Sequence, residues 1–182
     1  IVCNPEPQAK IGAYAFVKNA VYRRLLQNFG RNTILKETIL KFGNSGQRAT
    51  KIRNLIEMLG NHKSEFGEKA QTLVDEFRPK LIMNKVRKKS QLEDAERFVY
   101  LVREYLSVEM EYLGHIEYDE RVVDACENMR PFLLEQPNSK VSLSIYNILF
   151  NMGVTDRQLR YDRKSYKKMS KGVRLESKLW KD

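Results

Sequence analysis

The sequence contains two short apolar runs, Lys80-Leu81-Ile82-Met83-Asn84-Lys85-Val86 and Val108-Glu109-Met110-Glu111-Tyr112-Leu113-Gly114-His115-Ile116. Roughly 20 residues with a helical pattern lie between them. A strand, a helix and a strand at this spacing are typical of the βαβ unit of a parallel sheet. In such sheets, ligands bind beyond the carboxyl ends of the strands. We therefore expect any small-molecule site to lie next to residues 84–86 and 114–119.

The composition is that of an ordinary single domain, with 182 residues of which 42% are apolar and 31% charged. No apolar run approaches the ~20 residues that a membrane-spanning helix needs, and no signal-peptide pattern opens the chain. We expect an α/β fold, with a mostly parallel sheet flanked by helices, in a cytoplasmic protein. The chain opens on a strand-like Ile1-Val2-Cys3 instead of a methionine, which favours a fragment of a longer protein.

The periodic patterns divide the chain into four parts. In residues 1–30, the pattern predicts a strand that ends at two prolines, followed by a long helix that ends at a glycine. Residues 31–77 contain three further helical patterns, which form either an inserted subdomain or a cover for one face of the sheet. Residues 78–152 contain the βαβ unit and two later helices, and residues 153–182 form a basic tail helix.

Four side chains carry local predictions. Ser90 is expected to cap the helix that follows the first run, with Glu93 completing a capping box. Cys3 and Cys126 are too few for a disulfide framework. We therefore expect both cysteines to be buried thiols in a reducing compartment.

The formal net charge of +10 is distributed unevenly. Residues 153–182 contain ten Lys or Arg against four Asp or Glu, whereas residues 84–152 contain nine against twelve. A basic segment of this kind binds nucleic-acid phosphates, anionic lipids or acidic protein surfaces, or is simply solvated. The tail residues expected to make such contacts are Arg157, Arg160, Arg163, Lys164, Lys167, Lys168 and Lys171.

Several common catalytic and phosphate-binding motifs do not occur in these 182 residues. The nine glycines form no phosphate-binding loop, and the sequence has no H-E-x-x-H, C-x-x-C or G-x-S-x-G. His62 and His115 are the only histidines, so neither a metal site nor a histidine-based triad is expected. The chain by itself therefore carries no catalytic constellation.

A series of short motifs resembles the MinD/ParA-type ATPases, which are deviant-Walker P-loop proteins, and in particular their flagellar and polar-positioning branch. Residues 2–7 and 13–18 resemble the strand and helix that follow switch II in that family. Residues 79–86 are similar to the next core strand, which ends in Asn-Arg. Residues 113–122 look like the family's Leu-Gly-x-Ile-Pro-x-Asp-x-x-Val segment, and residues 130–140 contain pieces that look like its later Arg-Pro and Pro-x-Ser motifs.

The resemblance implies the C-terminal half of an ATPase that positions a division site, flagellum, chromosome or pole by ATP-dependent dimerisation. In the family, the phosphate loop, the magnesium ligand and both switches precede the strand at Ile1. ATP and Mg²⁺ would thus be held only in the full-length protein, and this fragment alone would be inactive. The family's adenine pocket falls within this chain. The implied adenine-binding residues are Asn84, Lys85, Ile116, Glu117, Tyr118 and Asp119.

Some features depart from the family or admit another interpretation. The family usually has proline where Glu117 stands, and arginine is common where Lys85 stands. The alternative for Asn84 is an Asx turn or a helix cap. The helices of residues 31–77 have no implied role, and they are a candidate surface for a protein partner. The alternative function is a non-enzymatic interaction module whose basic tail binds nucleic acid, or an anionic membrane as a peripheral protein of the inner membrane.

Overall fold

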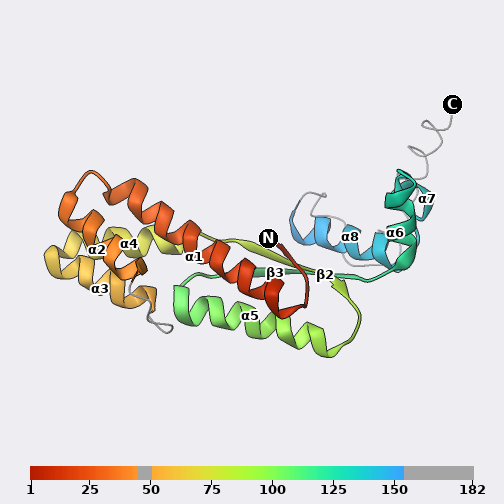
Figure 1. The fold of residues 1–182 in the computed structure, drawn as a ribbon, viewed down its shortest axis with the longest axis horizontal. Coiled ribbons are helices and arrows are strands. Elements are labelled where there is room, and N and C mark those ends of the chain that lie inside the picture. The colour runs from red at the N-terminus through yellow and green to blue at the C-terminus, as the bar shows by residue number, and fades with distance from the viewer. Residues whose placement is uncertain (45–50, 154–182) are drawn as a thin grey trace. The chain divides into compact units, whose positions relative to one another are not determined.

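The described residues of this computed structural model, 1–44 and 51–153, form eight helices and three strands (Figure 1). The elements are β1 (Val2–Cys3), α1 (Pro7–Phe29), α2 (Thr33–Asn44), α3 (Ile52–His62), α4 (Ser64–Asp75), β2 (Lys80–Val86), α5 (Ser90–Leu106), β3 (Glu111–Glu117), α6 (Glu120–Glu127), α7 (Phe132–Glu135) and α8 (Lys140–Asn151). Among these helices, none is both long and apolar enough to cross a bilayer.

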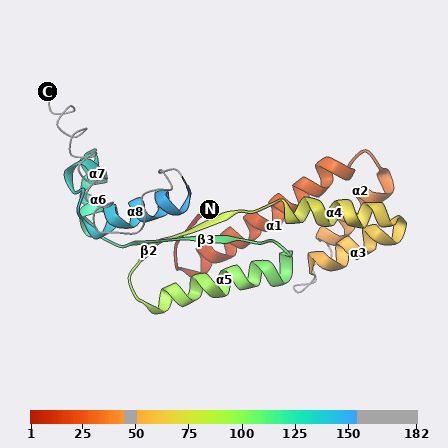
Figure 2. The ribbon, with the colours of Figure 1, turned by 180° about the vertical axis from the view of Figure 1, so that it is seen from behind.

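The three strands form one parallel sheet in the order β1-β2-β3. Val2 pairs with Ile82 and Cys3 pairs with Met83, so the short first strand runs parallel to β2. The crossover from β2 to β3 is α5, and β2 and β3 lie side by side when the molecule is seen from the front and from behind (Figure 2). The α/β class and the predicted βαβ unit are therefore confirmed.

The described chain divides into two compact units. The first unit contains residue 1, residues 6–81 and residues 93–112, and therefore helices α1 to α4 and most of α5. The second contains residues 2–5, residues 82–92 and the described residues from 113 onward, and therefore β1, most of β2 and β3, and helices α6 to α8. The carboxyl ends of β2 and β3 both belong to the second unit.

Helix α1 builds much of the core of the first unit. It begins at Pro7, whose ring suits the first helical position. Its fully buried side chains repeat every four residues along one stripe, which packs the helix on its neighbours. The helix ends at Phe29, where the N–H of Gly30 donates to the carbonyl oxygen of Leu26 at 2.8 Å. The stripe consists of Val17, Val21, Leu25 and Phe29.

Helices α3 and α4 approach each other closely at two glycines. A Cβ atom added to Gly67 would lie 2.9 Å from the Cα of Gly60 and 3.4 Å from the carbonyl oxygen of Ile56. Because both are backbone atoms, the helices could not keep this separation around a larger residue. The three helices predicted between residues 31 and 77 are thus present, and two of them pack through their backbones.

In the second unit, side-chain caps begin α6 and α8, and a glycine in β3 allows close packing. The Ser139 hydroxyl accepts from the N–H of Ser142 at 3.1 Å and so begins α8. The Asn151 amide, at the end of α8, donates to the carbonyl oxygen of Leu113 at 2.7 Å. Gly114 has a φ of +135°, which a residue with a side chain rarely adopts, and Ile148 lies beside it. These contacts hold α8 against β3.

The second predicted strand starts later than its apolar run. Residues 108–110 do not belong to β3, although Val108 and Met110 are buried. The ladder with β2 begins only at Glu111, whose N–H donates to the carbonyl oxygen of Pro79 at 3.0 Å. Because β2 begins at Lys80, the earlier residues have no strand to pair with.

Two further local predictions are wrong. Ser90 is already the first helical residue of α5, instead of the residue before it, and it makes no capping box with Glu93. The Gln91 side chain bonds the preceding turn. Cys3 is buried as expected, but Cys126 is exposed. Ala125 is the one buried residue of α6, and a neighbour one position along a helix points away from the buried face.

Candidate functional site

The site predicted from the sequence lies at the β2–β3 edge, which we define as residues 84–88 and 116–119 at the carboxyl ends of the two strands. Asn84 is half-buried and comes directly after Met83, the last residue of β2 that pairs with β1. Within the described part of the chain, its side-chain amide makes no hydrogen bond. The alternative of an Asx turn or a helix cap is therefore not formed there.

Lys85 distorts the end of β2. Its φ is +58°, in the left-handed region that a lysine rarely occupies. Leu81 and Met83 are buried at alternate positions, but Lys85 is exposed and Val86 is the next buried residue. The distortion therefore interrupts the strand's alternation of buried and exposed side chains. The exposed Lys85 side chain is thus turned away from the core. A residue held in such a conformation is more common at functional sites than elsewhere.

Tyr118 links the ends of the two strands. Its N–H donates to the carbonyl oxygen of Val86 at 2.9 Å, which places the first residue after β3 beside the last residue of β2. The guanidinium carbon of Arg87 lies 3.5 Å from the centroid of the Tyr118 ring. This is a stacked cation–π contact. Arg87 was not predicted as a site residue, and the only sequence signal for it was its place in a basic cluster after the strand.

Gln91 determines the shape of the turn between β2 and α5. Its side-chain oxygen accepts from the N–H of Arg87 at 2.7 Å and from the N–H of Lys88 at 3.1 Å. These two backbone donors are therefore satisfied by the protein itself and do not bind an anion. Gln91 is the second residue that sequence reasoning missed, because its partners are backbone groups.

The remaining predicted residues lie on β3 and the following turn. Ile116 is half-buried in the strand, and the carboxylate of Glu117 lies 3.7 Å from the ammonium nitrogen of Lys140. Asp119 caps α6, accepting from the N–H of Arg121 at 3.0 Å. The same carboxylate accepts from the Arg121 guanidinium at 3.0 Å and 2.6 Å. The side chains of Glu117 and Asp119 therefore have structural partners, and their backbone groups are the parts that can contact a ligand.

The electrostatics of Asp119 follow from its arginine partner. Hydrogen bonds from the Arg121 side chain hold the pKa of the Asp119 carboxyl below its usual range. The group is thus ionised at neutral pH and remains a helix cap.

Among the described residues, the side chains that could ligate a metal do not cluster at this edge. Within residues 1–44 and 51–153, no group of three His, Cys, Asp or Glu side chains lies close enough to hold a metal ion. The basic tail residues Arg157, Arg160, Arg163, Lys164, Lys167, Lys168 and Lys171 lie outside the described residues.

No protein-family model matches the chain, and no curated protein sequence matches it. A functional assignment therefore depends on the residues and the geometry of the β2–β3 edge.

Proposed function

We propose that this chain is part of a MinD/ParA-like ATPase and that its β2–β3 edge binds the adenine base of ATP. One observation carries the proposal. The side-chain amide of Asn84, which has no hydrogen-bond partner among the described residues, lies near the carboxyl end of β2, and Tyr118 directly follows the carboxyl end of the neighbouring parallel strand β3. Ligands of open α/β sheets bind at this end of the strands.

The Asn84 amide suits an adenine base. A carboxamide offers a donor and an acceptor side by side, and adenine presents an exocyclic N–H₂ beside a ring nitrogen acceptor. Guanine presents a carbonyl oxygen instead of the N–H₂ group at the same ring position. Asn84 is half-buried, so bonds to it would be partly shielded from water. We therefore expect discrimination in favour of adenine.

Tyr118 and Arg87 supply flat surfaces for a base. Aromatic rings and guanidinium planes both stack on nucleobases, and stacking contributes ~1–3 kcal/mol per base. The backbone bond from Tyr118 to Val86 keeps the ring next to the strand that carries Asn84. Hydrogen bonding and stacking can therefore act on one base from two adjoining chain segments.

The rest of an ATPase site would come from outside this chain. Phosphoryl transfer depends on a phosphate loop and a magnesium ion that position and neutralise the phosphates. The 182 residues contain no such loop. We expect the chain alone to bind the base of ATP or ADP without hydrolysing ATP, and the full-length protein to work as a nucleotide-dependent homodimer. Its place would be the cytoplasm or, peripherally, the inner membrane.

The proposal is tested by equilibrium binding of adenosine and guanosine to the chain and to Asn84→Asp. Nucleosides are used because they have no phosphate to attract the basic residues. We expect adenosine to bind more tightly than guanosine. Asn84→Asp should weaken the binding of adenosine by about 10-fold or more, because the amide donor is lost. The matched control is Asn54→Asp, which makes the same change at an exposed position of α3. Equal affinities for the two nucleosides, or equal losses of adenosine affinity in Asn84→Asp and Asn54→Asp, would show that Asn84 does not recognise the base.

A further inference from the structure

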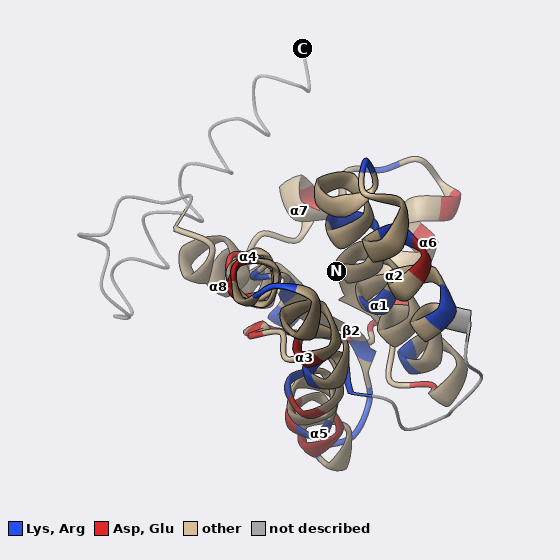
Figure 3. Ribbon diagram, turned by 90° about the vertical axis from the view of Figure 1, so that its left-hand side faces the viewer, with Lys and Arg blue, Asp and Glu red and all other residues tan. Residues whose placement is uncertain are grey.

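The end of β2 and the loop into α5 carry a run of positive charge. Four of the five residues at positions 85–89 are Lys or Arg, and they are coloured blue along the path from β2 to α5 in Figure 3. All four side chains are exposed. Among the described residues, none of the four forms an ion pair. We call these residues the basic turn, and they are Lys85, Arg87, Lys88 and Lys89.

The acidic residues near the end of β3 do not neutralise the basic turn. The carboxylate of Glu117 lies 3.7 Å from the ammonium nitrogen of Lys140, and the carboxylate of Asp119 lies 2.6 Å from the guanidinium of Arg121. Within the described part of the chain, Glu120 makes no ion pair, but one carboxylate does not balance four cations. Like charges this close repel one another, so a bound anion lowers the electrostatic energy of the turn.

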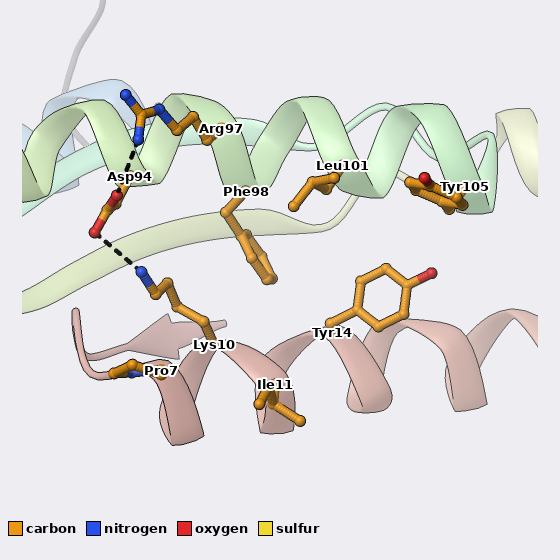
Figure 4. A pocket seen from close by; sticks show the side chains of 9 residues that line it. All are labelled: Pro7, Lys10, Ile11, Tyr14, Asp94, Arg97, Phe98, Leu101 and Tyr105. Atoms are coloured by element: carbon orange, nitrogen blue, oxygen red, sulfur yellow. Dashed lines mark hydrogen bonds and ion pairs between the residues drawn. The ribbon is translucent and has the colours of Figure 1, made fainter. Parts of the chain in front are cut away.

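The cavity between α1 and α5 in the first unit shows the opposite arrangement (Figure 4). The Lys10 ammonium nitrogen lies 3.0 Å from one carboxylate oxygen of Asp94, and the Arg97 guanidinium lies 4.0 Å from the other. Arg97 also lies 3.5 Å from the carboxylate of Glu93. The charges at that cavity are balanced by the chain itself. An anion that binds the basic turn, by contrast, displaces no carboxylate.

The backbone of the basic turn is held in one shape. The side-chain oxygen of Gln91 accepts from the N–H of Arg87 at 2.7 Å and from the N–H of Lys88 at 3.1 Å. The N–H of Leu92 donates to the carbonyl oxygen of Lys89 at 2.9 Å. A turn that is already ordered loses less conformational entropy when a ligand binds.

The ring of Tyr118 adds an aromatic surface to these cations. The guanidinium carbon of Arg87 lies 3.5 Å from the ring centroid, and the Tyr118 N–H donates to the carbonyl oxygen of Val86. Sites for single-stranded nucleic acid combine cations that follow the phosphates with aromatic rings that stack on bases. The bases of a duplex are already stacked and paired, so a single strand offers a base to the ring more readily. An acidic peptide would use the cations and leave the ring without a role.

We propose that the basic turn binds the phosphates of a single-stranded nucleic acid while one base of the strand stacks at Tyr118. The proposal rests on the proposed function in one respect, because the base occupies the same ring. It adds a second class of ligand, since the lysines of the turn can contact phosphates of neighbouring nucleotides. A strand and a mononucleotide therefore compete for the β2–β3 edge.

The test is fluorescence anisotropy of a labelled strand of about 12 deoxyadenosines, titrated with the chain at several salt concentrations. The double variant Lys88→Gln and Lys89→Gln should weaken binding of the strand by about 5-fold or more. The slope of log affinity against log salt should become less negative by about 1, because each phosphate contact of a single strand contributes ~0.7 to it. Neither lysine makes an ion pair or a side-chain hydrogen bond among the described residues, so the folded state loses no such contact.

The matched control is the double variant Lys36→Gln and Lys41→Gln. It removes the same charge from two exposed positions of α2. It should change the affinity for the strand by less than about 2-fold, because long-range attraction alone is largely screened by salt. Both double variants retain the basic residues of the tail, so the difference between them reports the turn.

Stacking at Tyr118 is tested with an abasic strand of the same length. Tyr118→Ala should weaken the deoxyadenosine strand by about 5-fold, because it removes the stacking surface. It should change binding of the abasic strand by less than about 2-fold. Tyr118→Phe retains the ring and should bind both strands as the original chain does.

Two results would overturn the proposal. One is a loss of strand affinity in the Lys88 and Lys89 variant that is no greater than in its control. The other is equal binding of the abasic and deoxyadenosine strands by the original chain, which would make the turn a site for any polyanion, an acidic protein segment included.

Adenosine, which has no phosphate, separates this proposal from the adenine site. If the chain binds adenosine but the strand does not depend on Lys88 and Lys89, the adenine site stands and the strand site is wrong. If the strand depends on both lysines and on Tyr118 while adenosine does not bind, the strand site stands and the adenine site is wrong.

Discussion

The guanidinium of Arg87 stacks on the ring of Tyr118, with 3.5 Å between the guanidinium carbon and the ring centroid. Arg87 follows β2 and Tyr118 follows β3, so the contact joins the two loops at the carboxyl ends of neighbouring strands. A cation–π contact of this kind contributes ~0.5–2 kcal/mol, depending on its exposure to water. The pair therefore fixes an aromatic ring at the β2–β3 edge, where we propose that a base binds.

Replacing Tyr118 by alanine should weaken adenosine binding. The substitution removes the ring and leaves Arg87 without its stacking partner, and base stacking on aromatic rings contributes ~1–3 kcal/mol. We expect a loss of about 5-fold to 100-fold, measured by equilibrium titration. Tyr118→Phe retains the ring and should bind as the original chain does. An unchanged affinity in Tyr118→Ala would exclude stacking on this ring.

Replacing Asn84 by alanine should leave the stability of the protein nearly unchanged. The side-chain amide makes no hydrogen bond within the described residues, so no bond of the described structure is lost. Urea unfolding should give a free energy of unfolding within ~0.5 kcal/mol of the original value. A loss of several kcal/mol in the free energy of unfolding would mean that Asn84 has a structural role. Its side-chain amide would then not be free to bind a ligand.

Replacing Gly67 by alanine should destabilise the first unit, although alanine is the better helix former. The new Cβ would lie 2.9 Å from the Cα of Gly60, so α3 and α4 would have to separate. We expect a cost of about 1–3 kcal/mol in urea unfolding.

The matched substitution for this prediction is Gly12→Ala in α1. No atom lies within 4 Å of a Cβ added at Gly12, and the position is exposed. Alanine should therefore stabilise the protein there by up to ~1 kcal/mol, through helix propensity alone. If both substitutions change stability in the same direction, the close approach of Gly60 and Gly67 does not control the packing of the two helices.

The stability of the first unit should fall at alkaline pH through Tyr22. Burial, and secondarily Tyr14, raises the pKa of Tyr22 to about 12 from its ordinary value of 10.0. The folded state therefore holds the hydroxyl proton more tightly than the unfolded state does. The resulting stabilisation is complete below pH 10 and is lost as the pH rises from about 10 to about 12.

NMR of chain labelled with ¹³C in its tyrosine rings checks this pH dependence. The signal that is missing from Tyr22→Phe identifies Tyr22, and that signal should titrate near pH 12 in the original chain. The same variant should lose less stability between pH 10 and pH 12 than the original chain does. A titration midpoint near 10 for Tyr22 would contradict the burial of its hydroxyl in solution.

The backbone of the βαβ unit could be predicted from the sequence because its signals are local. Strand β2 covers residues 80–86 as predicted, since Pro79 precedes an apolar run of strand length. Helix α1 begins at Pro7 and ends before Gly30, again as predicted. The start of β3 could not be predicted from its own residues, because it depends on where the neighbouring strand begins.

The candidate site was predictable only in part, for a similar reason. Asn84 is marked by its place near the end of the first run, and Tyr118 by its place shortly after the second. Arg87 and Gln91 act through contacts that the sequence does not show: one side chain stacks on a ring 31 positions later, and the other bonds the backbone of a turn. Asp119 is predicted to bind adenine, but in the structure its side chain caps α6. The resemblance to the MinD/ParA-type ATPases stays a prediction.

The most direct test of the adenine site is a titration of the ¹⁵N-labelled chain with adenosine, followed by amide NMR. We predict saturable shifts at the side-chain amide of Asn84 and at the backbone amides of Arg87 and Tyr118, and much smaller shifts with guanosine. Binding confined to other residues, or identical shifts with the two nucleosides, would contradict the account.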